Sequence, residues 1–193
     1  MDVRQHLFQY RSYTPLPFLI FMMTFAHPSV ESMAIGLCVI SCGEFLRLWG
    51  VAIAGSETRT TGPVGGTFLV TSGPFAHVRN PLYLGNILLY SGAAIMAHTP
   101  FPWLPLIGLF YFLLQYSLIV SLEEEYLQKT FGETFTRYRD SVPKFLPTLK
   151  KYTGVTMEQP TLEWMRGFQS EKRTLQAIGL LIVALAIIGW LRG

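Results

Sequence analysis

The sequence predicts an all-α protein, a polytopic membrane helical bundle of about five transmembrane helices. Two observations lead to this fold class. Half of the 193 residues are hydrophobic and only 14% are charged, whereas a soluble domain of this length carries about a quarter charged residues. The apolar residues also gather in long runs, separated by polar or Pro-rich connections, as membrane-spanning helices require. We expect one domain over residues 1–193.

Five apolar runs are the candidate membrane helices. They cover Leu16–Ala26, Ser32–Ala54, Leu82–Ala97, Trp103–Leu122 and Thr174–Leu191. The first run, of about eleven residues, is short for a span and has the length of a signal-peptide core. Thr24-Phe25-Ala26 is a poor cleavage site, however, and Pro28 follows at once. We therefore expect a short, retained membrane helix, with a re-entrant segment or a signal peptide as the alternatives.

One charged pair lies inside a predicted span. Glu44 and Arg47 are three residues apart in Ser32–Ala54 and so share a face of the helix. Charges at membrane depth are costly and usually pair or face a cavity. We favour a structural ion pair that fixes helix packing over a contact with a substrate.

The connections between the runs carry further signals. Gly55–Val78 contains several glycines, but they do not form a GxGxxG motif and no β-α-β pattern surrounds them, which excludes a Rossmann site. Glu123–Arg139 predicts a polar helical extension that ends before Val142-Pro143. Residues 148–173 form a mixed, charged connection, with a predicted interfacial helix around Leu162–Phe168.

Other composition signals exclude some functions. The net charge of +3 is too small to favour nucleic acid as a partner. Cys38 and Cys42 stack on one face of an apolar helix and are interpreted as small packing residues. The four histidines are dispersed, so no metal site is expected.

Basic residues predict the topology. Thirteen of the fifteen Lys and Arg residues lie in three segments, namely Arg4 and Arg11, Arg59 and Arg79, and nine residues between Lys129 and Arg173. With five spans, all three segments fall on the same side of the membrane. The positive-inside rule then places them, and the N-terminus, in the cytoplasm.

Two polar segments therefore meet on one face. Thr67–Gly85 contains the turn signal Ser72-Gly73-Pro74 and the helix start Asn80-Pro81, where Asn80 is expected to cap free backbone N–H groups. Leu122–Pro147 opens with an acidic cluster and carries several aromatic residues. Both segments flank the hairpin of the third and fourth predicted helices.

This pair of segments resembles the integral-membrane methyltransferases that include isoprenylcysteine carboxyl methyltransferase and phosphatidylethanolamine N-methyltransferase. The first family pattern, LVTSGPYxxxRHPxYxG, is matched by Leu69-Val70-Thr71-Ser72-Gly73-Pro74-Phe75 and by Arg79-Asn80-Pro81-Leu82-Tyr83-Leu84-Gly85. The second, EExxLxxxFGxxYxxYxxxVPRxxP, is matched by Glu123-Glu124, Leu127, Phe131-Gly132, Phe135, Tyr138 and Val142-Pro143-Lys144. Two motifs with the expected hairpin between them are far more specific than either alone.

The resemblance implies an S-adenosylmethionine site at the cytoplasmic end of the bundle, in a single methyltransferase-like domain whose motif-bearing core is residues 67–147. By position, Glu123 would bind the cofactor's amino group. The nucleoside part would be enclosed by Thr67, Phe68, Leu69, Val70, Phe75, Asn80, Pro81, Leu82 and Tyr83.

The implied acceptor is a lipophilic substrate that enters sideways from the bilayer, either an isoprenoid-linked carboxylate or a lipid headgroup amine. It would meet the cofactor near Asn80, Glu123, Arg139 and Lys144. Arg139 and Lys144 are the candidate catalytic residues, and anchoring to the membrane surface is the alternative for both.

The chain departs from the family pattern at three places. Asn80 replaces the usual His and cannot shuttle a proton. Lys144 replaces the usual Arg, so a bidentate contact becomes a single-point one. The fourth predicted helix ends in Leu118–Ser121 without an Arg to hold a substrate carboxylate, which weakens the case for an isoprenylcysteine-type substrate.

Two other functions stay open at this stage. A membrane reductase related to sterol reductases would use NADPH and need basic groups for the dinucleotide phosphates, and the Thr67–Gly85 loop offers chiefly Arg79. A non-catalytic membrane subunit or carrier would explain the substitutions at Asn80 and Lys144. The sequence leaves the oligomeric state open.

Overall fold

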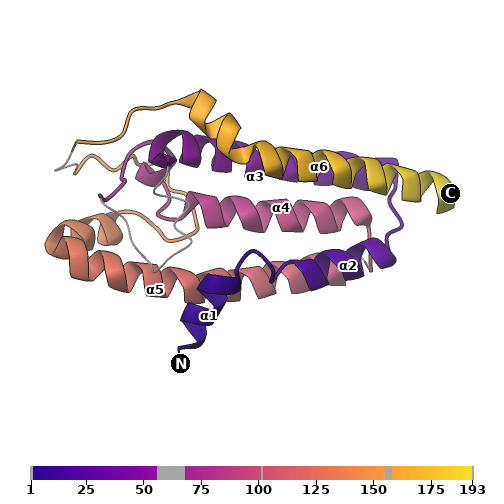
Figure 1. Cartoon of the computed structure of the whole chain (residues 1–193), viewed down its shortest axis with the longest axis horizontal. Coiled ribbons are helices and arrows are strands. Elements are labelled where there is room, and N and C mark those ends of the chain that lie inside the picture. Colours follow the sequence, from indigo (N-terminus) through magenta and orange to yellow (C-terminus); the bar gives the residue numbers. More distant parts are fainter. Residues whose placement is uncertain (1, 56–67, 101, 155–157, 193) are drawn as a thin grey trace.

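The protein is a bundle of helices. The computed structural model describes residues 2–55, 68–100, 102–154 and 158–192. Within these ranges every regular element is a helix, which confirms the all-α fold class. Five helices lie roughly side by side along the long axis of the molecule (Figure 1): α2 (Leu16–Thr24), α3 (Val30–Ala54), α4 (Pro81–Ala97), α5 (Trp103–Ser141) and α6 (Trp164–Arg192).

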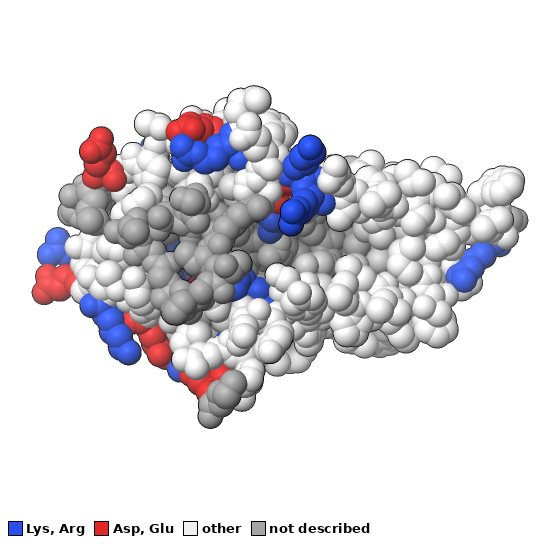
Figure 2. All heavy atoms as spheres, in the orientation of Figure 1, with Lys and Arg blue, Asp and Glu red and all other residues white. Residues whose placement is uncertain are grey.

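The five helices coincide with the five apolar runs of the sequence. By length and composition, α3, α5 and α6 can each cross a membrane, and α4 is a shorter apolar helix. On the face drawn in Figure 2, charged side chains gather on the half of the molecule that carries the far end of α5 and the start of α6. The rest of that face, toward the C-terminus, is almost uncharged. The chain is therefore an integral membrane protein.

Two helical segments differ from the sequence-based expectation. Val3–Tyr10 forms a short helix, α1, capped by the Asp2 side chain, where only a polar and aromatic segment was expected. The predicted interfacial helix around Leu162–Phe168 is wrong as a separate element, because its residues from Trp164 onward are the first turns of α6. Gly167 does not break this helix, since it packs directly against Leu48 and Ala52 of α3.

Paired glycines set α4 close against α3. A Cβ on Gly43 would lie 2.8 Å from the carbonyl oxygen of Gly85, and a Cβ on Gly92 would lie 2.8 Å from that of Gly36. On α3 the glycines Gly36 and Gly43 are seven residues apart, and on α4 so are Gly85 and Gly92. The two glycines of each helix therefore share one face of it. This close approach fixes the start of α4, where the first motif lies.

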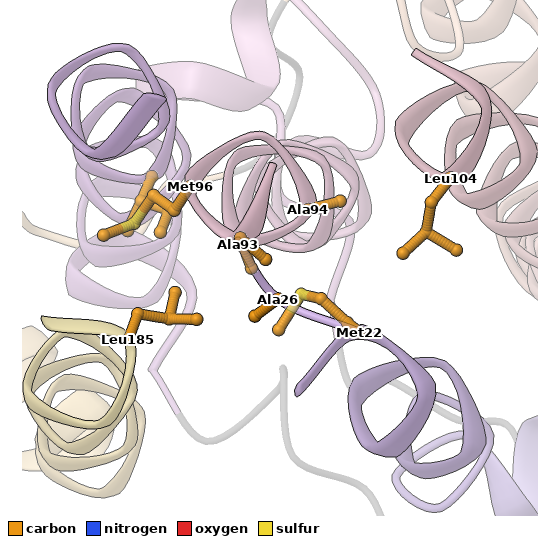
Figure 3. Packing of buried hydrophobic residues seen from close by; sticks show 9 residues of the cluster. Met22, Ala26, Ala93, Ala94, Met96, Leu104 and Leu185 are labelled. Atoms are coloured by element: carbon orange, nitrogen blue, oxygen red, sulfur yellow. The ribbon is translucent and has the colours of Figure 1, made fainter. Parts of the chain in front are cut away.

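The membrane-embedded core lies between five helices, α2 to α6, and the α2–α3 turn. Figure 3 shows Met22 of α2, Ala26 after it, and Ala93, Ala94 and Met96 of α4 packed with Leu104 of α5 and Leu185 of α6. All seven are buried. Because these residues are mostly small or unbranched, the helices approach closely here.

The polar extension of α5 folds back on the first motif. The helix continues to Ser141, as expected, but Gly132 has φ 53° and ψ −124°, a conformation that only glycine adopts easily. The chain turns there, and Phe135, Tyr138 and Val142 then pack on Leu69. The predicted turn at Ser72-Gly73-Pro74 is confirmed and continues into a short 3₁₀ helix, Gly73–Ala76.

Candidate active site

Arg79 joins the two motif-bearing segments. Its guanidinium donates to Glu124 Oε1 from Nε at 3.0 Å and from Nη2 at 2.9 Å. Nη1 donates to the backbone carbonyls of Arg139, at 2.8 Å, and Val142. The backbone N–H of Arg79 also donates to the Pro143 carbonyl at 2.9 Å. The start of α4 and the end of α5 are thus held as one unit.

Asn80 precedes α4 as predicted, but it does not cap the helix with its side chain. Its amide Nδ2 instead donates to the backbone carbonyl of Lys144 at 3.2 Å. The expected capping interaction is therefore wrong. The amide serves the contact between the two motifs, because the returning segment lies within its reach.

Glu123 is held by a tyrosine from α4. The Tyr83 hydroxyl donates to Glu123 Oε1 at 2.6 Å, and both side chains are half-buried. The neighbouring Glu125 is exposed and pairs with Arg4 of α1. Three consecutive glutamates thus have three different partners, and Glu123 is the one oriented by a neutral donor.

A cavity of about 920 Å³ lies beneath these segments. This volume suits a cofactor or a lipid-like ligand. At its polar end the cavity is lined by the acidic residues Glu123 and Glu124 and by aromatic residues, namely Phe68, Phe75, Tyr126, Phe135 and Tyr138. At its other end the lining is apolar and comes from α2, α4 and α6, namely Leu19, Met22, Leu89, Ala93, Ile178, Leu181 and Ala184.

Nine of the ten expected cofactor residues line this one cavity. They are Phe68, Leu69, Val70, Phe75, Asn80, Pro81, Leu82, Tyr83 and Glu123. The tenth, Thr67, lies outside the described residues. Their convergence from two segments agrees with a shared site, and the role of each stays a prediction.

The two candidate catalytic residues lie apart from the lining. Lys144 Nζ is 3.6 Å from Glu124 Oε2, and its side chain is 34% exposed. Arg139 Nε is 3.3 Å from Asp140 Oδ1, and its side chain is 42% exposed. Neither is among the residues that line the cavity, so their proposed roles remain untested.

Several polar residues deep in the cavity were not singled out as site residues. They are Arg11, Asn86, Tyr90, Tyr116 and Glu171. The sequence signals that could have found two of them are that Asn86 is an amide in an apolar helix and that Glu171 lies three residues before an apolar run. Arg47, expected to pair with Glu44, also lines the cavity; its Nε is 3.6 Å from Glu44 Oε2, and it binds Glu171 at 2.6 Å.

Curated proteins with related sequences are of two kinds. The cobalt-zinc-cadmium resistance protein CzcN of Cupriavidus metallidurans is 30% identical over 123 residues, covering 63% of this chain and 52% of the relative. Protein-S-isoprenylcysteine O-methyltransferase of Schizosaccharomyces pombe is 29% identical over 146 residues, covering 69% and 56%. The nickel-cobalt-cadmium resistance protein NccN of Alcaligenes xylosoxydans xylosoxydans is 29% identical over 125 residues, covering 64% and 54%.

The chain spans about half the length of these curated relatives. No solved structure matches it significantly. The family model described as phospholipid methyltransferase matches residues 32–134, which is more than half of the chain and includes most of α3, all of α4 and most of α5. The match confirms the resemblance carried by the two motifs: the chain belongs to the phospholipid methyltransferase family.

Proposed function

We propose that the protein transfers a methyl group from S-adenosylmethionine to a lipophilic acceptor drawn from the bilayer. The observation that carries this proposal is the single cavity, which joins a polar end formed by both motifs to an apolar end among the membrane helices. A water-soluble cofactor and a membrane lipid need such a shared chamber. We further propose that residues 1–193 form one domain and that its polar end faces the cytoplasm.

The residues at the polar end fit this cofactor. S-adenosylmethionine has an ammonium group, a cationic sulfur and an adenine ring, and it has no phosphate. The carboxylate of Glu123 and the faces of Phe75 and Phe135 suit these groups, whereas Glu124 is already paired with Arg79 and Lys144. The dinucleotide phosphates of NADPH would need cations beside the motif residues, where Arg79 is committed to Glu124. The other described arginines that line the cavity, Arg11, Arg47 and Arg173, lie outside the two motifs. The donor set therefore favours the methyl donor over the nicotinamide cofactor.

Each residue at this end has a distinct proposed role. When bound, the cofactor supplies an electrophilic methyl group. Glu123 holds the amino group, and the Tyr83 hydroxyl keeps the carboxylate oriented toward the cavity. Arg79 and Asn80 fix the returning part of α5 so that the aromatic walls stay in place. Positioning of this kind can supply much of the rate enhancement of a transfer reaction.

The apolar end suits the tail of the acceptor. Met22, Ala93 and Ala184 line it without any polar side chain atom that water could bind. Excluding water protects the methyl donor and strengthens the charges that act on it. The acceptor is either an isoprenoid-linked carboxylate or a lipid headgroup amine. Arg139 and Lys144 lie apart from the cavity lining, so we propose for both the alternative role of anchoring to the membrane surface.

The test is methyl transfer in a reconstituted membrane. The purified chain is placed in liposomes of extracted membrane lipids with S-adenosylmethionine that carries an isotopic label in its methyl group. We expect label in the lipid fraction that depends on the protein and disappears with excess S-adenosylhomocysteine. Complete absence of labelled lipid across neutral, amine-bearing and acidic lipid fractions would contradict the proposal.

A further inference from the structure

A cluster of charged and polar groups lies where the two ends of the cavity meet. Arg47 of α3 donates from Nη2 to Glu171 Oε2 of α6 at 2.6 Å, and from Nη1 to the Asn86 side chain oxygen of α4. All three residues line the cavity. Three helices that are far apart in the sequence thus contribute one polar group each to the same level of the wall.

This level lies at the polar end of the membrane-spanning part of the bundle, because Arg47 is inside the predicted span Ser32–Ala54 and Glu171 lies three residues before the predicted span Thr174–Leu191. Arg47 lies seven residues before the end of α3 and Glu171 seven residues after the start of α6, which places each about 10 Å from its helix end. Ionised groups at such a depth are costly and usually have a functional role. The side chain of Glu171 is 1% exposed and that of Arg47 is 15% exposed.

The packing around Arg47 makes room for it to reach the cavity. A Cβ on Gly85, the last residue of the first motif, would lie 2.5 Å from Arg47 Cγ. The absence of a side chain at Gly85 lets the arginine cross the α3–α4 contact. A guanidinium has five N–H donors in a planar fork; in Arg47 one on Nη1 bonds Asn86, one on Nη2 bonds Glu171, and the Nε–H lies 3.6 Å from Glu44 Oε2 without a hydrogen bond to any described residue. Arg47 therefore has donor capacity left at the cavity wall.

The neighbours of Arg47 add donors at the same level. Tyr90 and Tyr116 carry hydroxyl groups, line the cavity, and are close enough to interact with its charge. Beyond them the lining changes to Leu89 and Ala93. If the tail of a lipid fills the apolar end, its polar group would thus lie next to the Arg47 guanidinium, between the tail and Glu123.

We propose that Arg47 binds an anionic group, a carboxylate or a phosphate, of the lipid acceptor and so fixes how far the acceptor enters the cavity. The inference rests on the proposed function, because it assigns the acceptor end of that site. Two carboxylates of the described residues face the guanidinium, Glu44 at 3.6 Å and Glu171 at 2.6 Å; Glu171, the closer one, holds it in place and yields to the incoming anion. Arginine suits this role because its fork binds either oxyanion in a bidentate manner.

The test compares probes that share one tail. Binding of dodecanoate, dodecyl phosphate and dodecanol to the full chain is measured by calorimetry in a non-ionic detergent. We expect at least one anionic probe to bind about tenfold or more tightly than dodecanol, as a charged hydrogen bond predicts. The two anionic probes distinguish a carboxylate acceptor from a phosphate one. Equal binding of all three would overturn the proposal.

Two variants test whether Arg47 causes the preference for anionic probes over dodecanol. Arg47→Gln should abolish this preference. The matched control Arg137→Gln replaces an exposed arginine paired with Glu133 and should keep the preference. Glu171→Gln removes the closer of the two carboxylates beside Arg47, leaving Glu44, and should increase the preference. If Arg47→Gln keeps the full preference, or if Glu171→Gln abolishes it, the assignment is wrong. Should Arg47→Gln fail to fold, the Glu171→Gln result decides.

A separate readout distinguishes this inference from the proposed function. Binding of S-adenosylhomocysteine to the same variants should stay within about twofold of the unmodified chain, because Arg47 lies beyond the polar end. If the unmodified chain does not bind S-adenosylhomocysteine at all, that result counts against the proposed function. A preference for anionic probes that depends on Arg47 can still be measured in that case.

Discussion

Replacing Glu123 by Gln is the sharpest perturbation of the polar end. The substitution keeps the size and shape of the side chain and removes its charge. The Tyr83 hydroxyl, which donates to Glu123 Oε1 at 2.6 Å, can donate equally to the amide oxygen of Gln. The fold and the aromatic walls should therefore be unchanged. The lost interaction is the one between the carboxylate and the ammonium group of the cofactor.

The size of the effect follows from that single contact. A hydrogen bond between charged groups contributes about 1–3 kcal/mol, so affinity for S-adenosylhomocysteine should fall roughly 5- to 150-fold. The upper part of the range is expected because Glu123 is half-buried and lines the cavity, where water screens the charge weakly.

Calorimetric titration of S-adenosylhomocysteine into detergent-purified protein measures this loss. Glu125→Gln is the matched control, since Glu125 is an exposed neighbour that pairs with Arg4 and does not line the cavity. It should bind with unchanged affinity. Unchanged affinity in a folded Glu123→Gln protein, or an equal loss in both variants, would refute the role given to Glu123.

Three further predictions concern packing and the apolar end. Gly85→Ala should lower the free energy of unfolding by about 1–3 kcal/mol, because the added Cβ would lie 2.5 Å from Arg47 Cγ. A thermal unfolding assay measures this loss. The control Gly179→Ala adds a Cβ with nothing within 4 Å and should not destabilise the fold. Arg79→Gln should destabilise by about 2–3 kcal/mol, since it leaves the largely buried Glu124 carboxylate with Lys144, 3.6 Å away, as its remaining cation in the described part of the chain. An unchanged melting temperature would show that the Arg79–Glu124 pair does not hold the motifs together. Ala93→Phe should abolish labelling of lipid while S-adenosylhomocysteine still binds, because it fills the apolar end; retained labelling would place the acceptor elsewhere.

The membrane helices and the two motifs were predictable because their signals are local. The apolar runs reproduce α2 to α6, and Asn80-Pro81 marks the start of α4. Even here the physical detail differed. The Asn80 side chain was expected to satisfy the N–H groups of its own helix, yet it donates to Lys144, sixty-four residues away. The position of an element follows from local sequence, whereas the partner of a polar side chain depends on tertiary structure.

The acceptor end of the site could not be predicted for the same reason. Arg47 had a visible partner at i−3, Glu44, and the closer partner proved to be Glu171, one hundred and twenty-four residues away. The fold-back of α5 depends on Gly132, which reads as an ordinary motif glycine in the sequence. Contacts between distant helices follow from packing, and hydrophobic periodicity carries no information about them.

The central claim is that the polar end of the cavity holds S-adenosylmethionine. Calorimetric titration of S-adenosylhomocysteine into the detergent-purified chain, with a separate titration of NADPH for comparison, tests it most directly. We predict saturable binding of S-adenosylhomocysteine and none of NADPH. Binding of NADPH alone would support a reductase, and binding of neither by folded protein would contradict the proposed activity and favour a non-catalytic membrane protein.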